Sequence, residues 1–326
     1  MKMKAVLVTE LGGTEGMIYT DVDLPSINAN EVLIRVEKTS VNFADIKARY
    51  GNKGTKLPFI PGLDAMGIIE QVGSAVRDLQ AGQRVIAFPA GGSYAEYAVA
   101  SEQLTFPLPD GIDQMTAAAC PIVAFTAYKL LADVARLQAG ETVLIHAAAG
   151  GVGTTAIQLA KLLGASQVIG TVGSKQKVDS ALEAGADQVV VYTEGDFAQS
   201  VNDWTSGAGV DVILDSIAGA VTQKSLECLA YYGRLVQFGN SSGASGTVQT
   251  ADLHSSCRSV LGFSLGTTRA RRPELLRETA SKVFSYLAAG QLQIKIGREF
   301  SLSEAAQAHQ WVESRQSTGK VMLHVK

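Results

Sequence analysis

Small residues in the middle of the chain have the spacing of a phosphate-binding turn. The fingerprint Gly-x-Gly-x-x-Gly/Ala, which cradles the pyrophosphate of a dinucleotide, fits the segment in two registers. One register uses Ala148, Gly150 and Gly153, with alanine in the first glycine position, and the other uses Gly151, Gly153 and Ala156. In either register, backbone N–H groups at the start of a helix would face the negative charge. The amides expected to do so belong to Gly150, Gly151, Val152 and Gly153.

A second polar group follows about 20 residues later, where an NAD site usually carries an acidic residue for the ribose 2′-hydroxyl. Here the chain has Gly173, Ser174 and Lys175, with Lys177 next, and no carboxylate in that stretch. A hydroxyl and lysine ammonium groups suit a 2′-phosphate. The alternative is that the lysines are ordinary solvated residues at the start of a helix. Because the stretch lacks a carboxylate and offers these groups to a 2′-phosphate, we expect NADPH as the cofactor.

The elements that must position these residues alternate between strand and helix. An apolar, β-branched run at 142–147 predicts a buried strand, helical spacing follows from Ile157 to Leu163, and 167–172 predicts a second strand. Further parallel strands are expected at 188–192, 210–214, 234–238 and 258–263. This alternation predicts a doubly wound α/β sheet.

Ligands of such sheets bind at the carboxyl ends of the strands. Four residues lie at or just past the ends of the later strands and are candidate cofactor contacts, although the two phenylalanines could belong to the core instead. They are Ser216, Phe238, Gly239 and Phe263.

The first 120 residues predict short strands between turns, at 4–8, 32–36, 67–72, 84–87 and 94–99. The last 60 residues predict helices near 273–289 and 303–313, then a short strand that could return to the first domain. The expected domains are therefore residues 1–120 for the substrate, 121–266 for the cofactor, and 267–326 as a returning segment.

Composition excludes several classes of function. Of 326 residues 46% are hydrophobic and 18% are charged, which is typical of a compact enzyme, and the net charge of −3 argues against nucleic-acid binding. The three cysteines are widely spaced and indicate neither a disulfide framework nor a metal cluster. The first residues do not resemble a signal peptide, and the uncharged run 142–160 is too rich in glycine and threonine for a membrane span. A cytoplasmic protein is expected.

Several segments, taken in series, resemble the medium-chain dehydrogenase/reductase superfamily. They are VNFADIKARYG (41–51), PGLDAMGIIEQVG (61–73), AGQRVIAF (81–88), HAAAGGVGTTAIQLAK (146–161) and GKVMLHV (319–325). Within the superfamily the chain is most similar to the zinc-free NADPH:quinone oxidoreductases of the ζ-crystallin type. The resemblance implies a GroES-like β-barrel domain, a Rossmann domain and a homodimer.

The chain departs from the zinc-dependent members of that superfamily. Where they carry Gly-His-Glu, it has Gly62, Leu63 and Asp64, and neither histidine nor cysteine occurs before Cys120. A catalytic zinc site needs such ligands, so we expect no metal. Hydride donation from NADPH to a quinone is then the leading expectation. The alternatives are reduction of an activated C=C bond, as in an enone, and a cofactor-binding protein with a structural role.

The resemblance also assigns roles to single residues. Asn42 and Asp45 would lie beside the nicotinamide, although a turn residue and a helix cap are the ordinary alternatives. Lys47 stands where related quinone reductases have tyrosine, and it could polarise a substrate oxygen or be a solvated surface lysine. Tyr50 could donate a proton, stack on the substrate or simply pack in the barrel. The residues that resemble cofactor contacts of the family are Thr126, Ser174, Lys177, Tyr192 and Lys320.

Two further patterns favour no catalytic role. His146 ends an alanine-rich strand and is expected to be a structural histidine. The segment 239–243 matches Gly-x-Ser-x-Gly, but a nucleophile elbow leads straight into a helix and the residues that follow are not helical in pattern.

Overall fold

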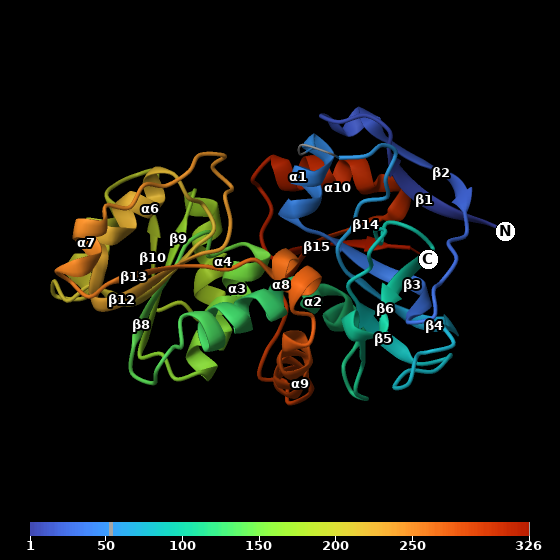
Figure 1. The fold of residues 1–326 in the computed structure, drawn as a ribbon. Helices are drawn as coiled ribbons and strands as arrows, with labels where there is room; N and C mark the ends of the chain where they lie inside the picture. Colours follow the sequence, from blue (N-terminus) through green and yellow to red (C-terminus); the bar gives the residue numbers. More distant parts are fainter. Residues whose placement is uncertain (52–54, 326) are drawn as a thin grey trace. The chain divides into compact units, whose positions relative to one another are not determined.

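A computed structural model describes residues 1–51 and 55–325 of the chain (Figure 1). Contacts between residues divide it into two compact units. The first unit, called the barrel unit below, consists of Met1–Phe125 and Thr267–Lys326. The second, the nucleotide unit, is Thr126–Gly266.

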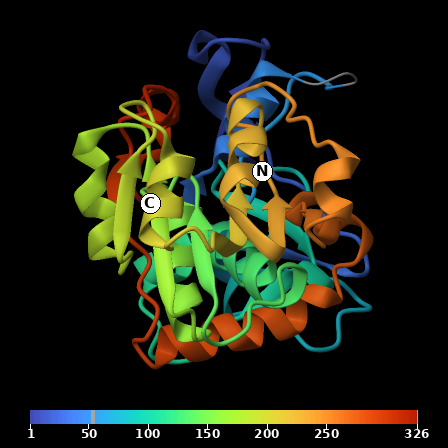
Figure 2. The same cartoon turned by 90° about the vertical axis from the view of Figure 1, so that its left-hand side faces the viewer.

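The nucleotide unit is built on a six-stranded parallel sheet, whose strands appear as neighbouring arrows in Figure 2. Its spatial order is β10-β9-β8-β11-β12-β13, so the chain reverses direction across the sheet between β8 and β11. This is the order of a Rossmann fold and its topological switch point. The strands are β8 (Thr142–Ile145), β9 (Gln167–Val172), β10 (Gln188–Val191), β11 (Val210–Asp215), β12 (Leu229–Gln237) and β13 (Ser259–Gly262).

Amphipathic helices connect these strands. α3 directs Ala156, Ile157 and Leu159 into the interior, and a core cluster joins Leu144, Ile213 and other residues of the sheet to the helices around it. The helices are α3 (Gly151–Leu162), α4 (Val178–Glu183), α5 (Phe197–Trp204), α6 (Ala220–Ser225) and α7 (Thr250–His254). The doubly wound α/β fold expected from the sequence is confirmed.

The barrel unit holds a seven-stranded sheet and a two-stranded hairpin. The larger sheet runs β14-β15-β3-β4-β5-β7, with β6 paired to β3, and the hairpin pairs β1 with β2. The strands are β1 (Lys2–Val8), β2 (Met17–Asp23), β3 (Glu31–Val41), β4 (Ala65–Val72), β5 (Arg84–Ala87), β6 (Tyr97–Ser101), β7 (Thr105–Pro107), β14 (Ile296–Ser301) and β15 (Lys320–His324).

The end of the chain completes this unit. β15 pairs antiparallel with β3, which places Val321 opposite Val41. α1 (Phe43–Tyr50) and α10 (Ala305–Glu313) contact each other. α9 (Leu275–Ala288) also belongs to this unit, whereas the boundary between the units falls within α2 (Gln114–Tyr128) and α8 (Leu265–Arg271). The predicted return of the last strand to the first domain is confirmed.

One segment, Gln114–Val134, is long and apolar enough to cross a membrane. It comprises α2 and a π-helical continuation, and most of it is buried inside the protein. A buried core helix passes the same test of length and composition.

Candidate functional site

The glycine turn joins β8 to α3. The strand ends two residues earlier than predicted because Ala147 adopts a left-handed backbone with φ 52°, which reverses the chain after His146. Gly150 then precedes α3 as its N-cap, and no side chain caps the helix there. The first amides of a twelve-residue helix are therefore left for an external acceptor, as a pyrophosphate site requires.

The geometry favours one of the two glycine registers. A Cβ added to Gly153 would lie 2.4 Å from the Ala147 carbonyl oxygen and 2.7 Å from backbone atoms of Ala148. Gly153 thus has the role of the third glycine, which allows close packing of helix on strand. A Cβ on Gly150 would meet only the Ala147 oxygen, at 3.3 Å. Ala148, which is fully buried, takes the first position.

The loop after β9 meets the turn after β10. Tyr192 N donates to the Val172 carbonyl at 3.1 Å, and Thr193 Oγ1 donates to the Gly173 carbonyl at 3.2 Å. A Cβ on Gly173 would lie 3.0 Å from the Tyr192 hydroxyl. The predicted residues Gly173, Ser174 and Tyr192 therefore belong to one small surface, and Lys177 follows in the same loop.

The structure adds an acidic residue to this surface. The sequence between Gly173 and Lys177 has no carboxylate, but the structure brings one from the next strand end. Lys175 Nζ lies 3.2 Å from Glu194 Oε2. Glu194 was missed because it lies 19 positions along the chain from Lys175, after a different strand.

The ends of β11, β12 and β13 also come together as predicted. A Cβ on Gly239 would lie 2.8 Å from the Ser216 carbonyl oxygen, so the two loops are in close contact. Phe238 N donates to the Asp215 carbonyl at 2.9 Å, and Phe263 N donates to the Gln237 carbonyl at 3.0 Å. Both phenylalanine side chains are partly exposed rather than buried in the core.

In the barrel unit, a buried polar cluster surrounds Asn42. Lys320 is only 3% exposed, and its Nζ donates to Asn42 Oδ1 at 2.7 Å and to the Val41 carbonyl at 3.3 Å. Burial lowers the pKa of Lys320, while the carboxylates of Asp64 and Asp45 oppose that effect. Lys320, predicted among the cofactor contacts, thus has Asn42 as its direct partner.

Asp64 neutralises the same cluster. Ser40 Oγ lies 2.8 Å and 2.9 Å from its two carboxylate oxygens, and Asn42 Nδ2 lies 3.4 Å from Oδ1. Complete burial raises the pKa of Asp64, and Lys320 counteracts this rise. A buried charge is tolerated when it is paired and hydrogen-bonded in this way.

Asp45 lies at the start of α1. Its Oδ2 accepts the Asn42 N–H at 2.8 Å, and its own N–H donates to the Asn42 carbonyl at 2.9 Å, so it caps the helix. Its Oδ1 is buried with no hydrogen-bond partner among the described residues. Burial raises the pKa of Asp45 to about 7, although the Asn42 N–H favours the ionised form. The Tyr94 hydroxyl lies 3.5 Å from Oδ2 and 3.1 Å from Nε2 of His309.

The other two predicted catalytic residues lie on the exposed side of α1. Lys47 is exposed, with its Nζ 5.6 Å from the centre of the Phe43 ring. Tyr50 is 57% exposed and donates its hydroxyl to Glu313 Oε1 at 2.7 Å, a bond that raises the pKa of Tyr50. The structure therefore brings Asn42 and Asp45 together with Lys320, and separates them from Lys47 and Tyr50.

Several residues have settled structural roles. His146 is buried between Thr171 Oγ1 and Ser225 Oγ, each 2.8 Å from a ring nitrogen, and burial lowers its pKa to about 4. This agrees with the interpretation as a structural histidine. Thr126, a predicted cofactor contact, is 7% exposed on α2, and its role stays a prediction. Residues 239–243 lead into an irregular segment before α7 begins at Thr250, which excludes a nucleophile elbow.

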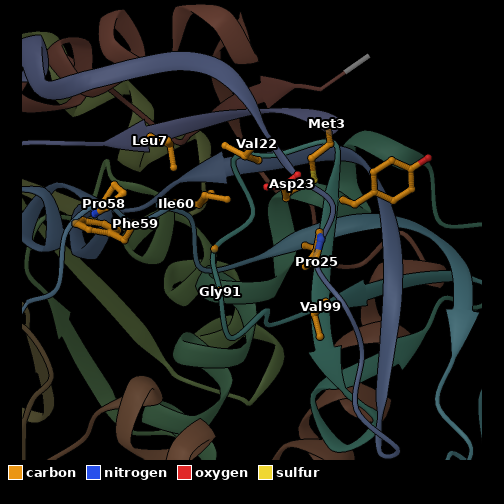
Figure 3. A pocket seen from close by; sticks show the side chains of 13 residues that line it. Met3, Leu7, Val22, Asp23, Pro25, Pro58, Phe59, Ile60, Gly91 and Val99 are labelled. Atoms are coloured by element: carbon orange, nitrogen blue, oxygen red, sulfur yellow. The ribbon is translucent and has the colours of Figure 1, made fainter. Parts of the chain in front are cut away.

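No group of three or more metal-binding side chains occurs within residues 1–51 and 55–325. A cavity of about 360 Å³ lies in the barrel unit (Figure 3), lined by apolar side chains that include Met3, Val22, Phe59 and Val99. None of the predicted site residues lines it. The candidate residues therefore form two groups, one at the strand ends of the nucleotide unit and one around Asn42 in the barrel unit.

Comparisons with known proteins agree with both units. Residues 28–110 match the alcohol dehydrogenase GroES-like domain family, and residues 151–281 match the zinc-binding dehydrogenase family. A quinone oxidoreductase of Pseudomonas aeruginosa is 36% identical over 323 residues, which cover 98% of this chain and 99% of the relative. Quinone oxidoreductase 1 of Escherichia coli is 37% identical, with 96% of each chain covered.

A solved structure supports the same relationship. The crystal structure of the Escherichia coli quinone oxidoreductase complexed with NADPH has a TM-score of 0.89 and 34% identity, and the match covers 98% of this chain and 99% of that one. A match over nearly the full length includes both the GroES-like and the Rossmann parts. The chain belongs to the quinone oxidoreductase family of the medium-chain dehydrogenases/reductases.

Proposed function

We propose that this protein is a zinc-independent, NADPH-dependent quinone oxidoreductase. The observation that carries the proposal is the strand–glycine turn–helix of the nucleotide unit, where Gly153 packs on the strand and Gly150 leaves the first amides of α3 uncapped. Relatives that match over nearly the whole chain are named quinone oxidoreductases, and one solved relative is a complex with NADPH.

The residues divide into three groups in this proposal. The amides of Gly151, Val152 and Gly153 would bind the pyrophosphate. The Gly150 N–H, which was also predicted to do so, already donates to the Ala147 carbonyl at 3.0 Å. Gly173, Ser174, Lys177 and Tyr192 would bind the adenosine 2′-phosphate, because a lysine and two hydroxyls can form charge-assisted hydrogen bonds with it. Thr126, Ser216, Phe238, Gly239 and Phe263 would border the rest of the cofactor.

The barrel unit would provide the substrate side. Because Lys320 and Asp64 bind the carboxamide of Asn42 from both ends, Asn42 is held in one orientation. Asp45 holds α1 in place and can keep a proton near neutral pH. Lys47 and Tyr50, on the exposed side of α1, could contact a bulky acceptor. They would not take part in the buried cluster around Asn42.

NADPH supplies the hydride when bound. A quinone needs no Lewis acid to accept it, because its carbonyl groups are already electrophilic. The acceptor takes two electrons and one proton with the hydride, and a second proton completes the hydroquinone. The protein's contribution would be to orient the acceptor and exclude competing reactions.

The proposal also covers the assembly and the location. We propose a cytoplasmic homodimer that binds neither nucleic acid nor membranes. The support is the edge position of β13, which pairs only with β12 among the described strands and has partly exposed apolar residues, together with the net charge of −3.

The test is NADPH oxidation at 340 nm, measured with a quinone and, separately, with a 2-enone. Turnover of the quinone supports the proposal. Turnover of the enone alone would move the protein to the C=C reductases. Tight NADPH binding without turnover of either acceptor would favour a cofactor-binding protein with a structural role.

A further inference from the structure

The turn after β10 is fastened to the loop after β9. Two of the contacts, Tyr192 N to the Val172 carbonyl and Thr193 Oγ1 to the Gly173 carbonyl, involve the backbone of the loop. The third is the ion pair of Lys175 with Glu194. Glu194 N donates to the Val191 carbonyl at 3.0 Å. This backbone hydrogen bond holds Glu194 in the turn after β10.

This places an acidic group beside the loop that would take the 2′-phosphate. Lys175 follows Ser174 directly, and its ammonium is held at 3.2 Å by Glu194 Oε2. The pair is exposed, with 75% and 49% of the respective side chains accessible. A phosphate monoester carries a charge of about −1.5 to −2 at pH 7. The same carboxylate therefore repels the phosphate and also competes with it for Lys175.

We infer that Glu194 is a specificity-determining residue that limits the preference for NADPH over NADH. The inference rests on the proposed function, because it requires the 2′-phosphate to bind at this loop. The carboxylate opposes a ligand that carries the phosphate and has little effect on one that lacks it. Removing the charge of Glu194 releases Lys175 and ends the repulsion, so binding of the phosphorylated ligand becomes tighter.

The experiment is isothermal titration of the full chain with adenosine 2′,5′-bisphosphate and with AMP, which differ only in the 2′-phosphate. For Glu194→Gln we expect about two- to fivefold tighter binding of the bisphosphate, the range that exposed ion pairs provide, and unchanged binding of AMP. The gain should shrink at 0.5 M salt, because exposed charges are screened.

Glu227→Gln is the matched control. Glu227 is also an exposed carboxylate of the nucleotide unit, and it pairs with Lys224 at 2.5 Å. It lies after α6 rather than at the β9–β10 loops, so its removal changes the net charge equally without acting on the 2′-phosphate. Both ligands should bind this variant as they bind the wild type.

The outcomes separate the inference from the proposed function. A wild type that binds the bisphosphate no better than AMP refutes the expected NADPH site itself. A wild type that prefers the bisphosphate, with a Glu194→Gln variant of equal or weaker affinity, leaves the NADPH site intact and overturns the inference. An equal gain in Glu227→Gln also overturns it, since net charge alone would then explain the effect.

Discussion

Replacement of Gly153 by alanine tests the glycine turn most sharply. The new Cβ would lie 2.4 Å from the Ala147 carbonyl oxygen, whereas ordinary contacts begin at 3.4 Å, so the start of α3 must move by about 1 Å. The atoms in the way belong to the backbone of Ala147 and Ala148, which cannot swing aside as a flexible side chain would. The helix and the strand must therefore separate.

The size of the effect follows from two opposing contributions. Overpacking of a close-packed site costs about 1–3 kcal/mol. Alanine in a helix is favoured over glycine by roughly 0.5–1 kcal/mol. We expect Gly153→Ala to lower the free energy of unfolding by about 1–2 kcal/mol. Since a displacement of about 1 Å can cost a factor of about 100 in an oriented site, NADPH affinity should fall at least about tenfold.

Gly150→Ala is the matched control. Its Cβ would meet one atom, the Ala147 carbonyl oxygen at 3.3 Å, so a movement of a few tenths of an ångström relieves the contact. Urea unfolding monitored by circular dichroism gives the stability of both variants, and NADPH fluorescence titration gives their affinities. If Gly153→Ala is no worse than Gly150→Ala in both assays, the assignment of Gly153 as the packing glycine is wrong.

Three further predictions concern the other parts of the site. Lys177→Ala should weaken binding of NADPH much more than of NADH in fluorescence titration, and an equal loss for both would refute its role at the 2′-phosphate. Burial raises the pKa of Asp45 from its ordinary value of 3.8 to about 7 in the folded protein, so folding retains its proton and the free energy of unfolding should fall as the pH rises from about 4 to about 7. The Asp45→Asn variant lacks this dependence. Its free energy of unfolding, measured with urea, should therefore rise relative to that of the wild type by a few kcal/mol between pH 5 and pH 8, at about 1.4 kcal/mol per pH unit up to pH 7. A difference between the two proteins that does not change with pH would contradict the raised pKa of Asp45. Tyr50→Phe should leave quinone and enone turnover within about twofold, because the hydroxyl is already donated to Glu313, and a large loss would identify Tyr50 as a proton donor.

The sequence predicted the nucleotide unit well because its central strands β8, β9 and β11 are mostly buried. Runs such as Gln167–Val172 are nearly continuous in apolar residues, and their ends are marked by glycine. In the barrel unit, β7 was missed because three residues are too short to show a period, and β2 and β14 were missed as well. Both strands are mostly exposed and alternate weakly between apolar and polar residues, so no hydrophobic period indicates them.

The parts of the candidate site that depend on neighbouring residues in the sequence were predicted. The contacts between residues far apart in the sequence were missed. The glycine turn and the strand ends follow from the fold. The contact of Lys320 with Asn42 joins residues 278 positions apart, and that of Tyr94 with His309 joins residues 215 positions apart. Neither pair leaves a spacing signal, because the final strand and helix are placed by packing of the barrel unit.

Zinc-independent transfer of hydride to a quinone is the central claim. The most direct measurement is NADPH oxidation at 340 nm with a quinone, after incubation of the protein with a strong chelator and removal of free metal. We expect the rate to be unchanged by the chelator, because no residue before Cys120 is a histidine or cysteine that could hold a catalytic zinc. Loss of turnover on chelation, restored by added zinc, would contradict it.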